Sequence, residues 1–129
     1  MTKTEMFDAI LDEVCQVCEV KKECILDGTR IQSVVDARIL SIQYIRRLGL
    51  SNDDIALIVM REVAGDATLC PDMKTLKQKA KGIDKAFKNY SDRCLQSKAF
   101  RLMSYEINQF CNERFSEDKI KVHIQDTKG

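Results

Sequence analysis

The sequence has no tryptophan, one proline, five glycines and one histidine among its 129 residues. So little turn-forming material argues against a β-sandwich or a β-barrel, which need many short turns. A single histidine leaves no Ser/His/Asp or Cys/His set of catalytic residues, and no glycine-rich phosphate-binding loop is present. We therefore expect a protein that is not an enzyme and that carries no cofactor.

Long apolar runs are also missing. No run approaches the ~20 residues needed to span a membrane, and the segment from Met1 to Phe7 lacks the apolar core of a secretion signal. Hydrophobic residues make up 44% of the chain and charged residues 32%, which is typical of a globular protein of one domain. These features predict a cytoplasmic protein without a membrane partner.

Six cysteines fall at positions 15, 18, 24, 70, 94 and 111. Cys15 and Cys18, with Cys24 nearby, have the spacing of half a zinc site, but a second half-site is missing and the only imidazole, His123, lies in the C-terminal segment. Cys15 and Cys18 also belong to an apolar helical pattern, where a free thiol packs as a small hydrophobic group. We expect reduced, metal-free cysteines, with a zinc site as the less favoured alternative.

Apolar residues recur at helical spacing in five segments. The spacing predicts helices over about residues 4–19 and 30–48, and a third helix that starts at a Ser51 cap and ends before a loop at 64–71. A fourth helix follows from Pro71 to Tyr90, and a fifth runs from Ser91 to about Phe115. The prediction is an all-α bundle of five helices in one domain over residues 1–115, followed by a polar tail over 116–129.

Charge is distributed unevenly around a net value of +1. Residues 1–27 carry a net charge of −4, whereas residues 72–101 carry +6. Within the basic segment five lysines are spaced three or four residues apart, at positions 74, 77, 81, 85 and 88. Such spacing forms one ridge along a helix, and we expect no acid within the ridge to pair with it at i, i+4. A ridge of this kind can neutralise DNA phosphates.

Several segments follow one another as in a known DNA-binding domain. They are Val14-Cys-Gln-Val-Cys-Glu-Val20, Arg30, Val34-Val-Asp-Ala-Arg38 and Leu48-Gly-Leu-Ser-Asn-Asp-Asp-Ile-Ala56. Together with Asp72-Met-Lys-Thr-Leu76 and Ile83, they resemble the C-terminal domain of DnaA, the bacterial replication initiator, over about residues 10–90. That domain is a helical bundle with a Trp-repressor-like helix-turn-helix, and it binds short sequences in duplex DNA.

The resemblance implies roles for individual residues. Arg30 takes the place of an arginine that enters the minor groove, and Arg38 that of an arginine that contacts a phosphate. The recognition helix begins with Asp72, Met73, Lys74 and Thr75, where Asp72, Lys74 and Thr75 stand at major-groove positions. With the lysine ridge, the predicted DNA-binding residues are Arg30, Arg38, Asp72, Met73, Lys74, Thr75, Lys77, Lys81 and Lys85.

The chain also departs from the DnaA pattern. Met73 stands in place of a histidine, Lys74 in place of a threonine, and Asn52 and Asp53 in place of an apolar pair that meets thymine methyl groups. About nine additional residues lengthen the turn at 61–71. A second register, starting at Gly65, is a weaker match because Pro71 then falls inside the recognition helix.

Two functions follow from these patterns. The favoured one is sequence-specific binding of double-stranded DNA by a DnaA-like helix-turn-helix, in replication or transcription control. The alternative is a helical protein–protein interaction module that has lost DNA recognition. In that case the acidic first helix or the fifth helix contacts a protein partner or a second copy of the chain.

Overall fold

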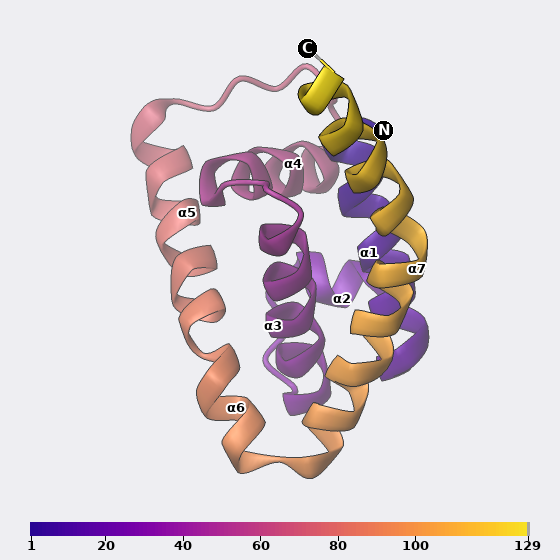
Figure 1. The fold of residues 1–129 in the computed structure, drawn as a ribbon. Helices are drawn as coiled ribbons and strands as arrows, with labels where there is room; N and C mark the ends of the chain where they lie inside the picture. Colours follow the sequence, from indigo (N-terminus) through magenta and orange to yellow (C-terminus); the bar gives the residue numbers. More distant parts are fainter. Residues whose placement is uncertain (129) are drawn as a thin grey trace.

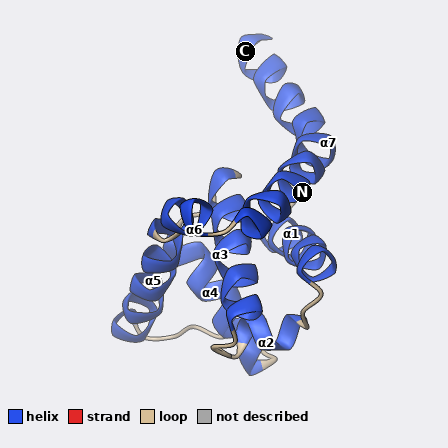
Figure 2. Ribbon diagram, turned by 90° about the horizontal axis from the view of Figure 1, so that it is seen from below, coloured by secondary structure: helices blue, strands red, loops and turns tan. Residues whose placement is uncertain are grey.

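The computed structural model describes the backbone of residues 1–128 and the side chains of residues 1–115. The described backbone is all-helical, as predicted, and contains no strand (Figure 2). Its helices are α1 (Lys3–Cys18), α2 (Lys22–Leu26), α3 (Gln32–Arg47), α4 (Asn52–Ala64), α5 (Met73–Lys88), α6 (Tyr90–Gln96) and α7 (Lys98–Lys128). Figure 1 shows α3 in the middle, with α5 on one side and α1 and α7 on the other.

The described backbone contains more helices than the five predicted, because the chain differs from the prediction at two places. The connector over 20–29 contains the short helix α2, which is anchored by the buried side chain of Ile25. The predicted fifth helix breaks at Ser97, which has extended backbone angles and whose Oγ accepts a hydrogen bond from Phe100 N at 3.1 Å. The backbone of α7 then continues through residues 116–128, the segment expected as a polar tail, whose side chains lie outside the described residues.

Side-chain caps fix where several helices begin. Ser51 caps α4 as predicted: its Oγ accepts a hydrogen bond from Asp54 N at 3.0 Å, while Asp54 accepts one from Ser51 N at 2.9 Å. Gly65 ends α4 in the left-handed conformation, with φ of 67°, which glycine adopts without strain. The polar sequence between apolar stripes therefore sets these boundaries locally.

Helix α3 is the centre of the bundle and contacts each of the other six helices. Ten of its 16 residues are buried, and several of the buried ones are polar. The Tyr44 hydroxyl lies 2.8 Å from the backbone oxygen of Ser104 and 2.7 Å from its Oγ, which ties α3 to α7. The hydroxyl of Tyr90 also contacts Ser104 Oγ, so α6 joins the same cluster.

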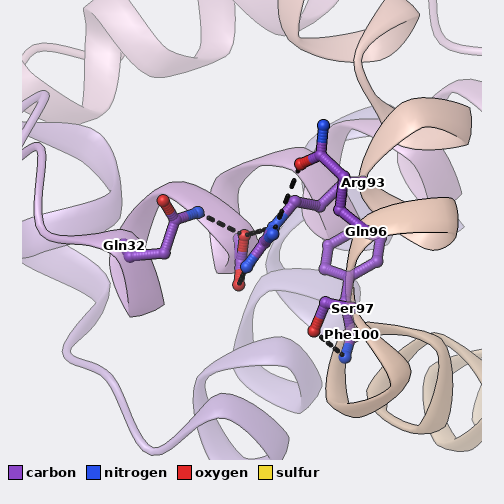
Figure 3. A network of polar contacts seen from close by, with 6 residues as sticks. Gln32, Arg93, Gln96, Ser97 and Phe100 are labelled. Atoms are coloured by element: carbon purple, nitrogen blue, oxygen red, sulfur yellow. Dashed lines mark hydrogen bonds and ion pairs between the residues drawn. The ribbon is translucent and has the colours of Figure 1, made fainter.

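A buried ion pair links α3 to α6. Asp36 is 6% exposed, and its two carboxylate oxygens accept hydrogen bonds from Arg93 Nε at 2.7 Å and Arg93 Nη2 at 3.1 Å. Gln32 Nε2 donates a further bond to Asp36 Oδ1 at 2.8 Å. Figure 3 shows the side chains of Gln32 and Arg93 pointing toward each other from these two helices. The pair fixes α6 against the start of α3.

Replacing Asp36 by Asn tests this link. The variant leaves the Arg93 guanidinium, whose side chain is 22% exposed, without its carboxylate. We expect the free energy of unfolding to fall by about 3 kcal/mol, the lower end of the cost of breaking a buried pair. Urea denaturation measures it. Glu106→Gln, at an exposed acid of α7, is the control and should change stability by less than about 0.5 kcal/mol. Equal effects of the two variants would contradict a structural role for the pair.

Candidate nucleic-acid interface

The predicted lysine ridge lies on the outer face of α5. Its five lysines, at positions 74, 77, 81, 85 and 88, are all exposed. The opposite face of the helix packs on the bundle through Ala80 and Ile83, which are 7% and 5% exposed. Because few apolar side chains attach α5 to the core, most of its circumference faces solvent.

Two ridge lysines form ion pairs. Lys77 Nζ lies 2.6 Å from Asp53 Oδ2 of α4, and Lys88 Nζ lies 2.8 Å from Asp84 Oδ2. The expectation that no acid pairs with the ridge at i, i+4 was therefore wrong, since Asp84 stands four residues before Lys88. The other ridge lysines, at 74, 81 and 85, have no acidic partner within 4.0 Å among the described side chains. Their charges remain available to an external anion.

The connection between α4 and α5 differs from a tight helix-turn-helix. Figure 1 shows the chain leaving the end of α4 and crossing back over the top of the molecule to the start of α5. This return segment, residues 65–72, is held by Arg61 Nε, which donates to the backbone oxygen of Leu69 at 2.9 Å. Helix α5 starts at Met73, so both Gly65 and Pro71 lie in the connection before the helix.

The beginning of α4 contacts the middle of α5 instead of an external ligand. Asn52 Nδ2 donates a hydrogen bond to Asp84 Oδ1 at 3.2 Å, and Asp53 pairs with Lys77. These are the two residues that replace an apolar pair in the DnaA pattern. Their side chains hold the two helices together.

The first residues of α5 form its N-terminal cap. Asp72 Oδ2 accepts a hydrogen bond from Thr75 N at 3.3 Å, and Asp72 Oδ1 accepts one from Thr75 Oγ1 at 2.6 Å. These bonds hold the pKa of the Asp72 carboxyl below its usual value. Met73, 66% exposed, and Lys74 project from the same tip, and neither side chain has a polar partner among the described residues. Two of the four predicted recognition residues are thus occupied by the cap.

The two predicted arginines differ in their surroundings. Arg38 donates three hydrogen bonds to backbone oxygens: Nε to Ile25 at 2.9 Å, and Nη2 to Cys24 and Thr29, each at 3.1 Å. Burial lowers the pKa of its guanidinium. The Arg38 side chain therefore holds the end of α2 against α3. Arg30 is exposed and has no hydrogen-bonded partner among the described residues.

A groove of about 490 Å³ separates α3 from α5. It brings together three of the predicted residues, Arg30, Arg38 and Lys85. It also contains Lys79, which sequence reasoning missed because that lysine lies off the ridge. The lining contains no aspartate or glutamate. Asp72, Met73, Lys74 and Thr75 lie further along α5, outside the groove.

Comparison with known proteins does not assign this chain to a family. No protein-family model matches this chain, and no match was found among curated proteins or solved structures. The resemblance to DnaA thus stays a prediction. Within the part of the chain that the structure describes, no helix is both long enough and apolar enough to pass through a membrane.

The cysteines are spread over several elements. No group of three potential metal ligands occurs among the described side chains. Cys15 and Cys18 are partly covered on α1, and burial raises the pKa of both thiols, that of Cys18 to about 12. Cys70 is exposed in the return segment. Cys15 and Cys18 are therefore protected thiols, whereas the thiol of Cys70 is accessible.

Thiol labelling tests this separation. At pH 8 the raised pKa keeps the Cys18 side chain as a thiol, whereas the thiolate is the form that reacts. We expect iodoacetamide to modify Cys70 well before Cys18, as measured by mass spectrometry of peptides from briefly labelled protein. Equal labelling rates in the folded chain would contradict the described burial of α1.

Matched substitutions separate the two arginines. Arg38→Met leaves three backbone oxygens without their donor, so we expect the free energy of unfolding to fall by about 2 kcal/mol. Arg30→Met removes an exposed charge and should change it by less than about 0.5 kcal/mol. Urea denaturation of both variants measures the difference. A stable Arg38→Met variant would show that this side chain is dispensable for the fold.

Proposed function

We propose that this protein binds duplex DNA through the exposed face of α5. The observation that carries the proposal is the row of lysines without acidic partners, at positions 74, 81 and 85. The first and last of these lysines are 11 positions apart, so they are about 16.5 Å apart along the helix at ~1.5 Å per residue. A row of that length can reach several phosphates of a DNA backbone. Arg30 adds a further exposed charge across the groove from Lys85.

In this proposal, phosphates supply most of the affinity. Asp72 and Thr75 are occupied by the helix cap, and Asn52 and Asp53 by α5. Base contacts then fall to Lys74 and Met73 at the tip of α5, and to Arg30, which can sense groove width. Sequence preference is consequently expected to be weaker than in a domain whose recognition residues are all free. The resemblance to DnaA favours a role in replication or transcription control.

An interaction with protein is the second candidate, and one observation favours it. Leu95 of α6 and Leu102 and Tyr105 of α7 are 82%, 57% and 62% exposed. Large apolar side chains this open to water commonly mark a contact surface when they are contiguous. The two candidates differ in their salt dependence, because phosphate contacts weaken steeply with salt whereas an apolar interface does not.

The DNA proposal predicts the effect of removing two unpaired lysines. Lys74→Ala and Lys81→Ala lie two turns apart on the exposed face of α5. In combination they should weaken binding to every duplex sequence, and should reduce the slope of log K against log salt by about 2. Fluorescence anisotropy with labelled duplexes, titrated at several salt concentrations, measures both quantities.

The matched control removes the same charge elsewhere. Lys21→Ala with Lys98→Ala changes two exposed lysines that lie outside α5 and have no described partner. This variant should retain the salt slope of the parent protein. The proposal fails if both double variants behave alike, or if neither random nor selected duplexes bind below about 100 µM at physiological salt. The protein–protein candidate then takes its place.

A further inference from the structure

We infer that the groove between α3 and α5 is a binding site for a small amphipathic anion, an aliphatic chain that ends in a carboxylate. The inference rests on the shape and lining of the groove and does not depend on DNA binding. Its volume of about 490 Å³ lies within the roughly 300–1,000 Å³ of typical small-molecule sites.

The floor of the groove is apolar. Val35, Ile39 and Ile42 line it from α3, and Ile83 and Ala86 line it from α5. A smaller cavity of about 60 Å³ adjoins it and shares five lining residues with it, which are Gly28, Arg38, Ile42, Lys79 and Ile83. The smaller cavity continues into the core between side chains such as Phe7 and Leu11. An aliphatic chain can therefore lie along the floor with its end directed toward the core.

The charged residues that line the groove are all basic, and Asp27, outside the lining, interacts electrostatically with Arg38. Arg30, Lys79 and Lys85 belong to the lining and have no described ion-pair partner, while Arg38 is fixed in place by three backbone oxygens. Neither the groove nor the smaller cavity is lined by a carboxylate. An anionic group on the ligand satisfies this arrangement, whereas a neutral or cationic group does not. Lys79, an exposed residue, and Arg38 belong to both linings, so two basic residues lie where the groove meets the smaller cavity.

A glycine keeps the groove open. Gly82 lies in the interior of α5, where glycine stabilises a helix less than alanine does. A Cβ atom added at this position meets nothing within 4 Å, so close packing does not require glycine there. Gly82 is also one of the groove-lining residues. The missing side chain leaves room for a ligand. Glycine makes the helix less stable than alanine would, and the packing of the protein alone gives no reason for glycine at this position.

Titration of the full chain with octanoate, in the absence of DNA, tests the inference by calorimetry. Octanoate should bind saturably with one site per chain, and 1-octanol should bind roughly tenfold more weakly because it lacks the charge. Gly82→Leu should abolish binding by filling the groove. Lys79→Met should weaken it about fivefold, whereas Lys98→Met, at an exposed lysine of α7 outside the lining, should leave it unchanged.

Folding of each variant is checked by its urea midpoint, and Gly82→Leu should be no less stable than the parent chain. A readout in the parent protein avoids dependence on any variant. In methyl NMR spectra, the signals of Ile39, Ile42 and Ile83 should shift on addition of octanoate. The inference is overturned if no saturable binding occurs up to about 10 mM octanoate, if folded Gly82→Leu binds as well as the parent, or if octanol binds as tightly as octanoate. Because no DNA is present, these outcomes are separate from those of the DNA experiment.

Discussion

Polar side chains that are buried on a central helix have little access to water, so their partners must come from neighbouring helices. Helix α3 carries such buried polar side chains and contacts every other helix, so the neighbouring helices must supply the hydrogen-bond partners. Asp36 is satisfied by Arg93 of α6, and the Tyr44 hydroxyl by Ser104 of α7. Each contact is directional, so it fixes the position of the partner helix more narrowly than apolar packing does. The order of helices around α3 depends on these buried bonds as well as on the size of its isoleucine and leucine side chains.

Helix α5 is held differently, and its candidate functions depend on that difference. It attaches to the bundle through the buried Ala80 and Ile83, through the partly buried Leu76, Ala86 and Phe87, and through polar contacts to the start of α4. Such a narrow attachment leaves the lysines of one face in solvent and leaves a groove toward α3. The external row of charge and the apolar groove are thus two results of one packing arrangement. They remain chemically distinct, because the row consists of lysines in solvent whereas apolar side chains of α3 and α5 form the floor of the groove.

The sequence predicts the features that arise from neighbouring residues and misses those that arise from distant ones. Apolar spacing located the main helices, and Ser51 marked a boundary because its cap involves only Asp54. Helix α2 was missed because five residues show little periodicity, and because it is held by Ile25 and by Arg38 from the next helix. In the candidate interface, the exposed lysines were predicted, but the pairing of Lys77 with Asp53 was not. That pair depends on how α4 crosses α5, which no local pattern encodes.

The bonds that satisfy α3 also bear on how the chain acquires its structure during synthesis. Asp36 precedes Arg93 by 57 positions, and Tyr44 precedes Ser104 by 60. At a translation rate of about 5–20 residues per second, roughly 3–12 s separate the emergence of each partner. The chain of α4 and α5 is made during that interval, but the Asp36 carboxylate and the Tyr44 hydroxyl still lack these two partners. The central helix of the finished molecule is consequently among the last to become fully enclosed, and contacts this distant in sequence slow the folding of a helical protein relative to one stabilised by local contacts.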